Sequence, residues 1–396
     1  YKICDTGITK NDLALTWDAL LLLEDSSGKR KPDMRFQIAR ACFDTGMKEQ
    51  ALAAFGEIVA ESPIQEAYIT KADEFIRGRF SPEEQAAFWQ RAIDSGCLSH
   101  LPWLYLGRAL EADGQAAAEA YKNAYAANKN DGETILCYAT TNMDTVGVSE
   151  VIALIKKAID SQPDLMPMAA ARLLPAIVML QQSGEHEDAL LLTTFAETIT
   201  QEKEPLHLQQ AEALIALGRY EEAETLLNPL LDTPFSDRAT ALLDQVFKLN
   251  NSVEERAALW TTLAETYPAN EAVTLQHRIA MGDLGMSLLA SSDYAAALAA
   301  FETACVPACQ QPLFNVGLHI AEIALHPEEK HTQAIAALIR EQPGLAPLAV
   351  SHLLRAAETQ QHDGRQNEAR ILAEAAATLD PGSGSGLFQL GITEEA

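Results

Sequence analysis

A spacing of about 34 residues recurs along this chain and constrains its fold more than any other feature of the sequence. The segment RFQIARACFDTGMKEQALAAFGEIVAESP predicts two amphipathic helices with a turn at Gly46 and an end at Pro63. The segment DLGMSLLASSDYAAALAAFETACVPAC has similar gaps, with Cys309 at the place of Pro63. Such a repeat predicts an array of helix pairs, because each pair leaves an apolar face that only the next pair covers.

The ends of successive units can be followed along the sequence. They fall at Pro63, Cys97, near Lys129, Pro163, near Gln201, near Phe235, Pro268, Cys309, Pro343 and Pro381, and several intervals are 34 residues. The 41-residue step from Pro268 to Cys309 predicts an insertion or a longer helix near Glu271 to Ala280. About ten units therefore cover residues 32–381.

Small and large side chains recur at matching places in these units, for example Gly107 and Gly285 at a small position and Tyr121 and Phe301 at a large one. The pattern resembles the tetratricopeptide repeat (TPR), a helix-turn-helix unit of 34 residues. This resemblance implies an all-α fold, a right-handed α-solenoid or superhelix of TPR-like helix-turn-helix repeats. Irregular units leave its pitch and curvature open.

Residues 1–31 precede the first full unit. Leu13, Trp17, Leu20 and Leu21 stand at helical spacing behind an N-cap at Thr9 or Asn11. We expect an N-terminal capping or partial-repeat helix here, followed by a polar linker. Because the chain begins without Met, we also expect it to be a processed or excised fragment.

Composition excludes some classes of partner. With 56 acidic and 29 basic side chains, the formal charge of −27 repels nucleic acid phosphates and anionic lipids. No run approaches the roughly 20 apolar residues of a membrane-spanning helix, so we expect no direct membrane insertion. The hydrophobic share of 48% with only 6% aromatic residues reflects Ala and Leu, which favour helices.

The cysteines bear on localisation. They are scattered, at Cys4, Cys42, Cys97, Cys137, Cys305 and Cys309. This pattern favours free buried thiols in the cytoplasm, with a periplasmic location as the alternative. Cys305 and Cys309 form either a local disulfide or two packing thiols, and their spacing is not that of a zinc site.

The sequence holds no recognisable catalytic constellation. It lacks a dinucleotide fingerprint, a P-loop, an HExxH motif and a GxSxG elbow. His319, His326 and His331 lie close together with Glu328 and Glu329, but Pro327 and the two glutamates fit a solvated helix start better than a metal site. Glu83-Glu84, Glu221-Glu222 and Glu254-Glu255 likewise fit the starts of second helices. We therefore predict no enzyme, no cofactor and no metal.

In tetratricopeptide arrays the first helix of each pair lines the concave side. In the first three units this rule selects a cationic and aromatic set, Phe36, Arg40, Phe43, Lys71, Arg77, Tyr105 and Arg108. Either these cations balance nearby carboxylates, or they form an anion-accepting groove for the acidic or C-terminal end of a peptide.

Later units have a different lining. The same rule selects Gln245, Lys248, Met286, Leu289, Phe314, Asn315, Leu318, Arg355 and Gln361. This mixture of apolar and amide groups suits an extended or helical peptide. The alternative is that Met and Phe at helical spacing belong to the core.

These features predict a non-enzymatic interaction scaffold that binds a peptide segment of a partner protein in the concave groove. Two alternatives stay open: the TPR portion of a larger bacterial exopolysaccharide export or assembly protein, and a regulatory domain of an enzyme whose catalytic part is missing. The expected partner is a protein or peptide, including the peptide of a neighbouring molecule.

The end of the chain differs from the repeats. GSGSG at residues 382–386 precedes LFQLGITEEA at residues 387–396. We interpret the first segment as an engineered flexible linker and the second as a fused partner peptide at raised effective concentration. A natural disordered tail and a cloning remnant are the alternatives. The candidate bound residues are Leu387, Phe388, Leu390, Ile392, Glu394 and Glu395.

Overall fold

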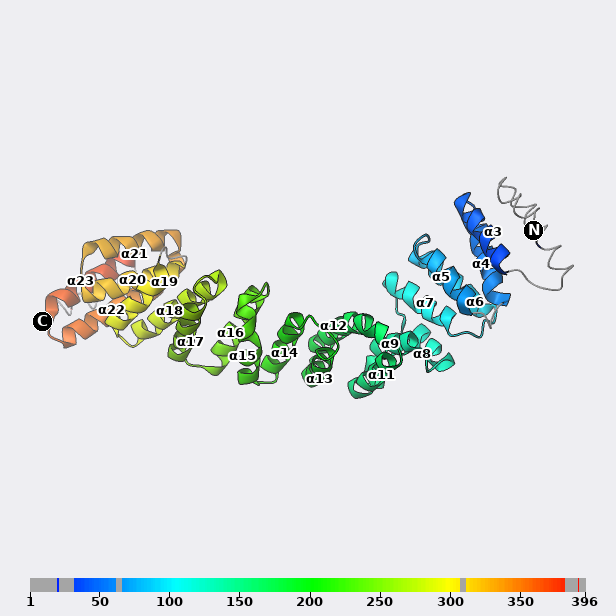
Figure 1. Cartoon of the computed structure of the whole chain (residues 1–396). Helices are drawn as coiled ribbons and strands as arrows, with labels where there is room; N and C mark the ends of the chain where they lie inside the picture. Colours follow the sequence, from blue (N-terminus) through cyan, green and yellow to red (C-terminus); the bar gives the residue numbers. More distant parts are fainter. Residues whose placement is uncertain (1–19, 21–31, 62–65, 307–310, 382–390, 392–396) are drawn as a thin grey trace. The chain divides into compact units, whose positions relative to one another are not determined.

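The computed structural model describes residues 20, 32–61, 66–306, 311–381 and 391, and every regular element within them is a helix (Figure 1). The chain divides into two compact units, Tyr1–Gln201 and Glu202–Ala396, called unit 1 and unit 2 below. Each unit is a stack of helix pairs. The prediction of an all-α solenoid is confirmed.

Unit 1 contains five described helix pairs. They are α3 (Pro32–Asp44) with α4 (Lys48–Glu61), α5 (Glu66–Arg77) with α6 (Pro82–Asp94), α7 (Leu101–Ala112) with α8 (Ala118–Ala127), α9 (Gly132–Thr141) with α11 (Val148–Ser161), and α12 (Met166–Gln182) with α13 (His186–Ala196). The short helix α10 (Met143–Val146) and the 3-10 helix η1 (Pro163–Leu165) are connections.

Unit 2 also contains five described pairs. They are α14 (Glu204–Ala216) with α15 (Tyr220–Leu227), α16 (Ser236–Asn250) with α17 (Val253–Thr266), α18 (Glu271–Ala290) with α19 (Tyr294–Cys305), α20 (Pro312–Leu325) with α21 (Glu329–Glu341), and α22 (Ala346–His362) with α23 (Gln366–Leu379). The 3-10 helices η2 (Asn228–Asp232) and η3 (Pro343–Leu345) lie between pairs.

The repeat ends expected from the sequence match these pairs. Most lie two to five residues after the last helical residue of a pair, for example Pro163 after Ser161 and Pro343 after Glu341, whereas Phe235 lies eight residues after Leu227 because η2 intervenes. The long step before Cys309 is explained by α18, which has 20 residues. Within each unit, first helices contact the next first helices, as α5 contacts α7 and α18 contacts α20.

Local sequence signals set the helix boundaries. Gly46 has a φ of 85°, which the turn between α3 and α4 requires and which glycine adopts without a Cβ clash. Capping boxes start α6 and α17, where Ser81 with Glu84 and Ser252 with Glu255 satisfy backbone N–H groups reciprocally. The acidic pairs predicted at second-helix starts are therefore confirmed there, and Glu221-Glu222 lies in the first turn of α15.

Close packing within a unit depends on small residues placed against aromatic rings. A Cβ at Gly107 would collide with the ring of Tyr121, and a Cβ at Gly285 would lie 2.7 Å from the ring of Phe301. Both rings are fully buried. These contacts allow the first helix of a pair to approach the second, as the recurring small and large residues predict.

Hydrogen bonds also join residues about one repeat apart. Tyr105 Oη donates to Thr70 Oγ1 at 3.3 Å across 35 positions. Asn270 Nδ2 donates to Ser236 Oγ at 2.7 Å across 34 positions. Contacts between equivalent places of successive pairs thus carry the sequence period into three dimensions.

One described helix, Pro163–Gln182, is long and apolar enough to cross a membrane by length and composition, contrary to our reading of the sequence. It comprises η1 and α12, and α12 packs against α9 and α13. Arg172 in its middle is ion-paired with Glu111 of α7. Helix α12 therefore packs as the other helices of the solenoid do. The absence of direct membrane insertion stays a prediction.

The predicted terminal segments are largely outside the described residues. Of the N-terminal helix only Leu20 is described, and it is helical and fully buried in the core of unit 1. The linker at 382–386 and the candidate bound residues Leu387, Phe388, Leu390, Ile392, Glu394 and Glu395 lie outside this part of the chain.

Candidate functional site

The aromatic residues of the cationic and aromatic cluster that the sequence predicts in the first three repeats lie at or in the core of unit 1. Phe36 and Phe43 of α3 approach Phe75 of α5 edge-on, with ring centroids 6.3 and 5.4 Å apart. Tyr105 of α7 is 5% exposed and its ring lies 5.0 Å from that of Trp89. A bound peptide would therefore reach little of Tyr105.

Two cations of the same cluster contact carboxylates on first helices. Asp73 of α5 is buried, and its carboxylate lies 3.4 Å from Arg77 and 3.6 Å from Arg108. Burial raises the pKa of Asp73, while the two arginines oppose that rise. Arg108 also pairs with Glu133 of α9. An incoming anion would have to compete with these carboxylates for Arg77 and Arg108. The other two cations of the cluster, Arg40 and Lys71, are exposed to solvent.

The row of ion pairs continues along the first helices of unit 1. Arg172 of α12 donates to both carboxylate oxygens of Glu111, at 2.6 and 3.1 Å, and to Thr140 at 2.9 Å. Tyr121 donates to the same carboxylate at 2.7 Å. Burial would raise the pKa of Glu111, but the bonds from Arg172 and Tyr121 outweigh burial and lower it. This group ties α7, α8, α9 and α12 together.

A second buried ionic group lies in unit 2. Asp244 of α16 is 6% exposed and accepts bonds from Arg256 at 2.8 and 3.0 Å and from Trp260 at 3.3 Å. Arg256 also bonds Asp283 of α18 at 2.6 Å. Lys248, predicted to line a groove, lies 2.7 Å from Asp244. Its ammonium group is thus engaged within the solenoid, although the side chain is exposed.

The structure has an open groove between the first helices α14 and α16, which we call the α14–α16 groove. It has a volume of about 460 Å³ and is lined by Glu212, Ile215, Ala216, Arg238, Leu242, Gln245 and Leu249. Leu242 and Ile215 form buried parts of its wall, and Leu249 is 56% exposed. Arg238 Nε donates to Glu212 Oε1 at 3.1 Å across the groove. Gln245 is the predicted site residue that the groove contains.

The remaining predicted residues lie further along unit 2. Phe314 of α20 is 4% exposed and packs where a Cβ at Gly282 would collide with it. Arg355 Nη1 of α22 donates to the carbonyl of Ala290 at 2.6 Å. Met286, Asn315 and Leu318 are half-buried. Peptide binding by these residues stays a prediction.

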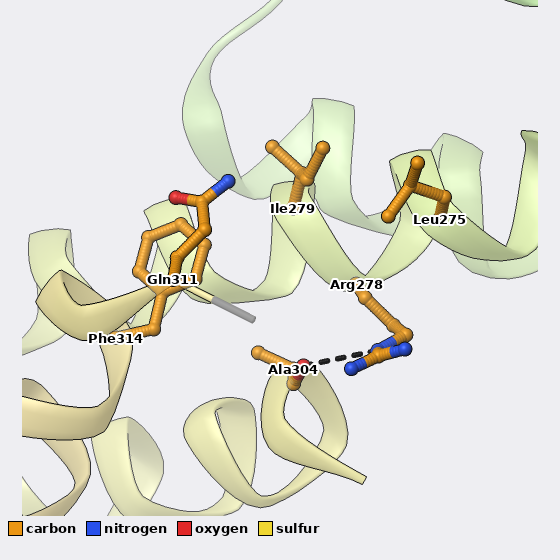
Figure 2. A pocket seen from close by; sticks show the side chains of 6 residues that line it. All are labelled: Leu275, Arg278, Ile279, Ala304, Gln311 and Phe314. Carbon is orange, nitrogen blue, oxygen red and sulfur yellow. Dashed lines mark hydrogen bonds between the residues drawn. The ribbon is translucent and has the colours of Figure 1, made fainter. Parts of the chain in front are cut away.

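A smaller cavity lies where α18, α19 and α20 meet. Figure 2 shows Arg278 and Ile279 of α18 on one side and Gln311 and Phe314 on the other. Arg278 Nε donates to the carbonyl of Ala304 at 3.1 Å. The cavity has a volume of about 30 Å³, far below that of the α14–α16 groove.

Comparison with known proteins adds context to this architecture. No family model matches the sequence, and no curated protein matches it. Among solved structures, the chain is similar to the P58(IPK) TPR domain (12% identity, 82% of this chain and 96% of that chain, TM-score 0.25). It is also similar to a tetratricopeptide repeat protein from Parabacteroides merdae (14%, 66% and 98%, TM-score 0.29) and to a chain of the APC/C hetero-tetramer Cut9-Hcn1 (13%, 99% and 95%, TM-score 0.25).

The helix pairs and their period form the all-α solenoid that the resemblance to the tetratricopeptide repeat implies. At such low TM-scores, no partner or activity is transferred from the solved structures to this chain. The α14–α16 groove is characterised by its own lining residues.

The sequence left open that the predicted cations balance nearby carboxylates, but it did not identify those carboxylates. Asp73 and Arg108 are 35 positions apart, close to one repeat, so charges of opposite sign at equivalent places were an available signal. Arg238 and Glu212, 26 positions apart, had no such signal. Their contact depends on how α14 and α16 pack.

Proposed function

We propose that this chain is a non-enzymatic interaction scaffold that binds a segment of a partner protein along its first helices. The observation that carries the proposal is the α14–α16 groove, which two consecutive first helices form together. Its volume of about 460 Å³ is in the usual range for ligand pockets. Leu249 offers exposed apolar area at its edge, and Gln245 offers both a donor and an acceptor.

The chemistry of the groove favours an amphipathic partner segment. Leu242 and Leu249 would contact an apolar anchor, and the amide of Gln245 would bond to main chain. Arg238 and Glu212 compensate each other, so the groove has no strong preference for one charge.

The C-terminal decapeptide LFQLGITEEA is a defined first probe for this groove. It supplies four apolar side chains, at Leu387, Phe388, Leu390 and Ile392. We propose that it occupies a groove of this kind, in its own chain or in a neighbouring molecule. Its two glutamates, Glu394 and Glu395, would then remain in solvent.

Substitution of Leu249 tests the proposal. Fluorescence anisotropy with a labelled LFQLGITEEA peptide is measured for the wild type and for Leu249→Asp. We expect saturable binding that weakens about tenfold or more in the variant, because a carboxylate replaces an apolar contact. Leu98→Asp is the control, since Leu98 is 85% exposed and lies outside the groove. Equal binding by both variants and the wild type would contradict the proposed site.

We also propose that the protein works in a reducing compartment, the cytoplasm. Cys42, Cys97 and Cys137 are buried thiols without a disulfide, and burial raises the pKa of Cys42 and of Cys137, which keeps these thiols unreactive. Cys309 lies outside the described residues, so a bond with Cys305 is untested. Mass spectrometry after thiol blocking of the native and the denatured protein would detect that bond and argue for export.

A further inference from the structure

Two imidazoles and one carboxylate converge where α20 meets α21. His319 and Glu322 are three positions apart on α20, and His331 lies in the first turn of α21. Glu322 Oε2 lies 2.7 Å from His319 Nδ1 and 2.7 Å from His331 Nδ1. The two Nδ1 atoms are 3.5 Å apart. All three ligand-type atoms thus lie within 4.8 Å of one another.

The sequence suggested a different arrangement for this region. Helix α21 begins at Glu329, two residues after Pro327, and Glu328 is its N-cap, paired with Lys330. These charged residues are exposed, as a solvated helix start requires. His331, however, is 8% exposed and points to α20. The cluster therefore includes Glu322, which lies four positions before HPEEKH on α20, and excludes Glu328 and Glu329.

The spacing of these atoms fits a transition metal. Ligand atoms about 2.0–2.1 Å from a tetrahedral Zn²⁺ lie roughly 3.3 Å from one another. The Nδ1–Nδ1 distance of 3.5 Å is close to this value. The two nitrogen–oxygen distances would need to open by about half an ångström, which a small rotation of Glu322 provides. That side chain is 30% exposed and has room to turn.

The donor set also favours particular metals. Two imidazole nitrogens and one carboxylate oxygen suit Zn²⁺, Co²⁺ and Ni²⁺, whereas Ca²⁺ and Mg²⁺ prefer oxygen ligands throughout. Three protein ligands leave a fourth tetrahedral position for water. His319 and Glu322 are partly exposed, with side chains 23% and 30% accessible, so an ion can enter from solvent.

We propose that His319, Glu322 and His331 form a three-ligand site for a divalent transition metal, Zn²⁺ by its donor set, that links α20 to α21. The two helices belong to one pair, and the metal would hold them together. Binding of the ion to the folded chain alone would stabilise unit 2 by mass action. This site is separate from the α14–α16 groove and does not depend on peptide binding.

Calorimetric titration of the chelator-treated full chain with ZnCl₂ tests the site. We expect about one Zn²⁺ per chain with micromolar or tighter affinity. Substitution of CoCl₂ should give the visible bands of tetrahedral Co²⁺ without the intense thiolate bands that cysteine ligation produces. Heating the protein with and without Zn²⁺ should show a higher Tm in its presence.

Three variants assign the ligands. His331→Ala should weaken Zn²⁺ binding about a hundredfold or more, and Glu322→Gln about tenfold or more. Glu322→Gln retains the side-chain shape, so it stays informative if His331→Ala fails to fold, as judged by circular dichroism. His326→Ala is the matched control and should bind as the wild type does, since His326 is exposed outside the cluster. Absence of binding by millimolar Zn²⁺, or unchanged binding in His331→Ala and Glu322→Gln, would overturn the proposal.

Discussion

Gly285 of α18 lies directly against the ring of Phe301 of α19, so that a Cβ on residue 285 would be 2.7 Å from a ring carbon. The same ring also lies against Gly317 of α20, where an added Cβ would collide with it. Phe301 is fully buried. One aromatic side chain therefore fills space between three helices of two successive pairs, and the absence of a Cβ at Gly285 and Gly317 leaves room for its ring.

Gly285→Ala should destabilise unit 2. Alanine gains about 1 kcal/mol in helix propensity, but overpacking of a rigid core costs about 1–3 kcal/mol. We expect a net loss of about 1 kcal/mol in the free energy of unfolding, measured by urea denaturation followed by circular dichroism. Gly56→Ala in α4 is the control, because a Cβ there has 4.0 Å to its nearest neighbour, Phe88. The control should gain stability, and a gain in both variants would contradict the packing argument.

Arg256→Met should destabilise the protein far more than a surface substitution does. The change leaves Asp244 buried with one fewer charge partner, and loss of a partner from a buried pair costs about 3–5 kcal/mol. Lys248, which lies 2.7 Å from Asp244, should keep the loss toward the lower end of that range. Urea denaturation of the wild type and the variant gives the difference directly.

Arg370→Met provides the comparison for this change. Arg370 and Glu374 form an exposed pair one helical turn apart, with side chains 56% and 46% accessible. Such pairs contribute about 0.3–0.5 kcal/mol. Similar losses in Arg256→Met and Arg370→Met would mean that the Asp244 group is not a buried ionic network in solution.

Ser292→Gly should stabilise the turn between α18 and α19. Ser292 has a φ of 63°, a left-handed value that costs a residue with a Cβ about 1–2 kcal/mol. The greater chain entropy of glycine offsets part of this gain, so we expect about 0.5–1 kcal/mol. The reverse change, Gly364→Ser at the equivalent turn of the next pair but one, where φ is 77°, should lose stability. Thermal unfolding of both variants compares their Tm values.

The sequence was sufficient for the repeat because the repeat is a local pattern. Gly46, which gives the turn its left-handed residue, and Gly285 with Phe301, which bring two helices together, are each visible within one unit. Their spacing then fixes the order of helix pairs. The 41-residue step between unit ends predicted an insertion or a longer helix, and α18 is that longer helix.

The candidate site was harder to predict because it depends on contacts between helices. A rule based on positions selects Phe36 and Arg108 as groove residues, yet Phe36 approaches Phe75 and Arg108 pairs with Asp73. Whether a first-helix side chain meets solvent or the next helix depends on the crossing of the helices, which residue types do not specify. Gln245 is exposed on a first helix and lines the α14–α16 groove, although its contact with a peptide stays a prediction, whereas Leu249 was not selected.

The histidine cluster shows the same limit. His331 is 12 positions from His319 in the sequence, and the antiparallel return of α21 along α20 brings their Nδ1 atoms to 3.5 Å. The spacing of His319 and Glu322, one helical turn apart, was the available signal. From the sequence alone, the histidines were instead grouped with Glu328 and Glu329 of the HPEEKH segment.

The carboxyl group of Asp131 should make the free energy of unfolding of unit 1 depend on pH over a defined range. Its carboxylate caps α9 by accepting the N–H of Thr134 at 2.8 Å, and His100 lies 3.7 Å away. Burial by itself would raise the pKa of Asp131, but the interactions with His100 and Thr134 outweigh burial and lower the pKa to about 2. The folded-state value is thus below the ordinary value of 3.8. The ionised carboxylate therefore contributes stability that is fully present above about pH 4 and is lost as the pH falls through about 2.

Asp131→Asn tests this dependence, because asparagine can still cap α9 but carries no charge. At pH 7 we expect the wild type to be more stable than the variant by about 2 kcal/mol, and at pH 3 by about half of that. Urea denaturation at both pH values measures the two differences. Asp188→Asn, at an exposed aspartate in the first turn of α13, is the control for loss of one surface charge. A difference between wild type and Asp131→Asn that stayed constant from pH 7 to pH 3 would show that the carboxylate gains nothing from its partners on folding.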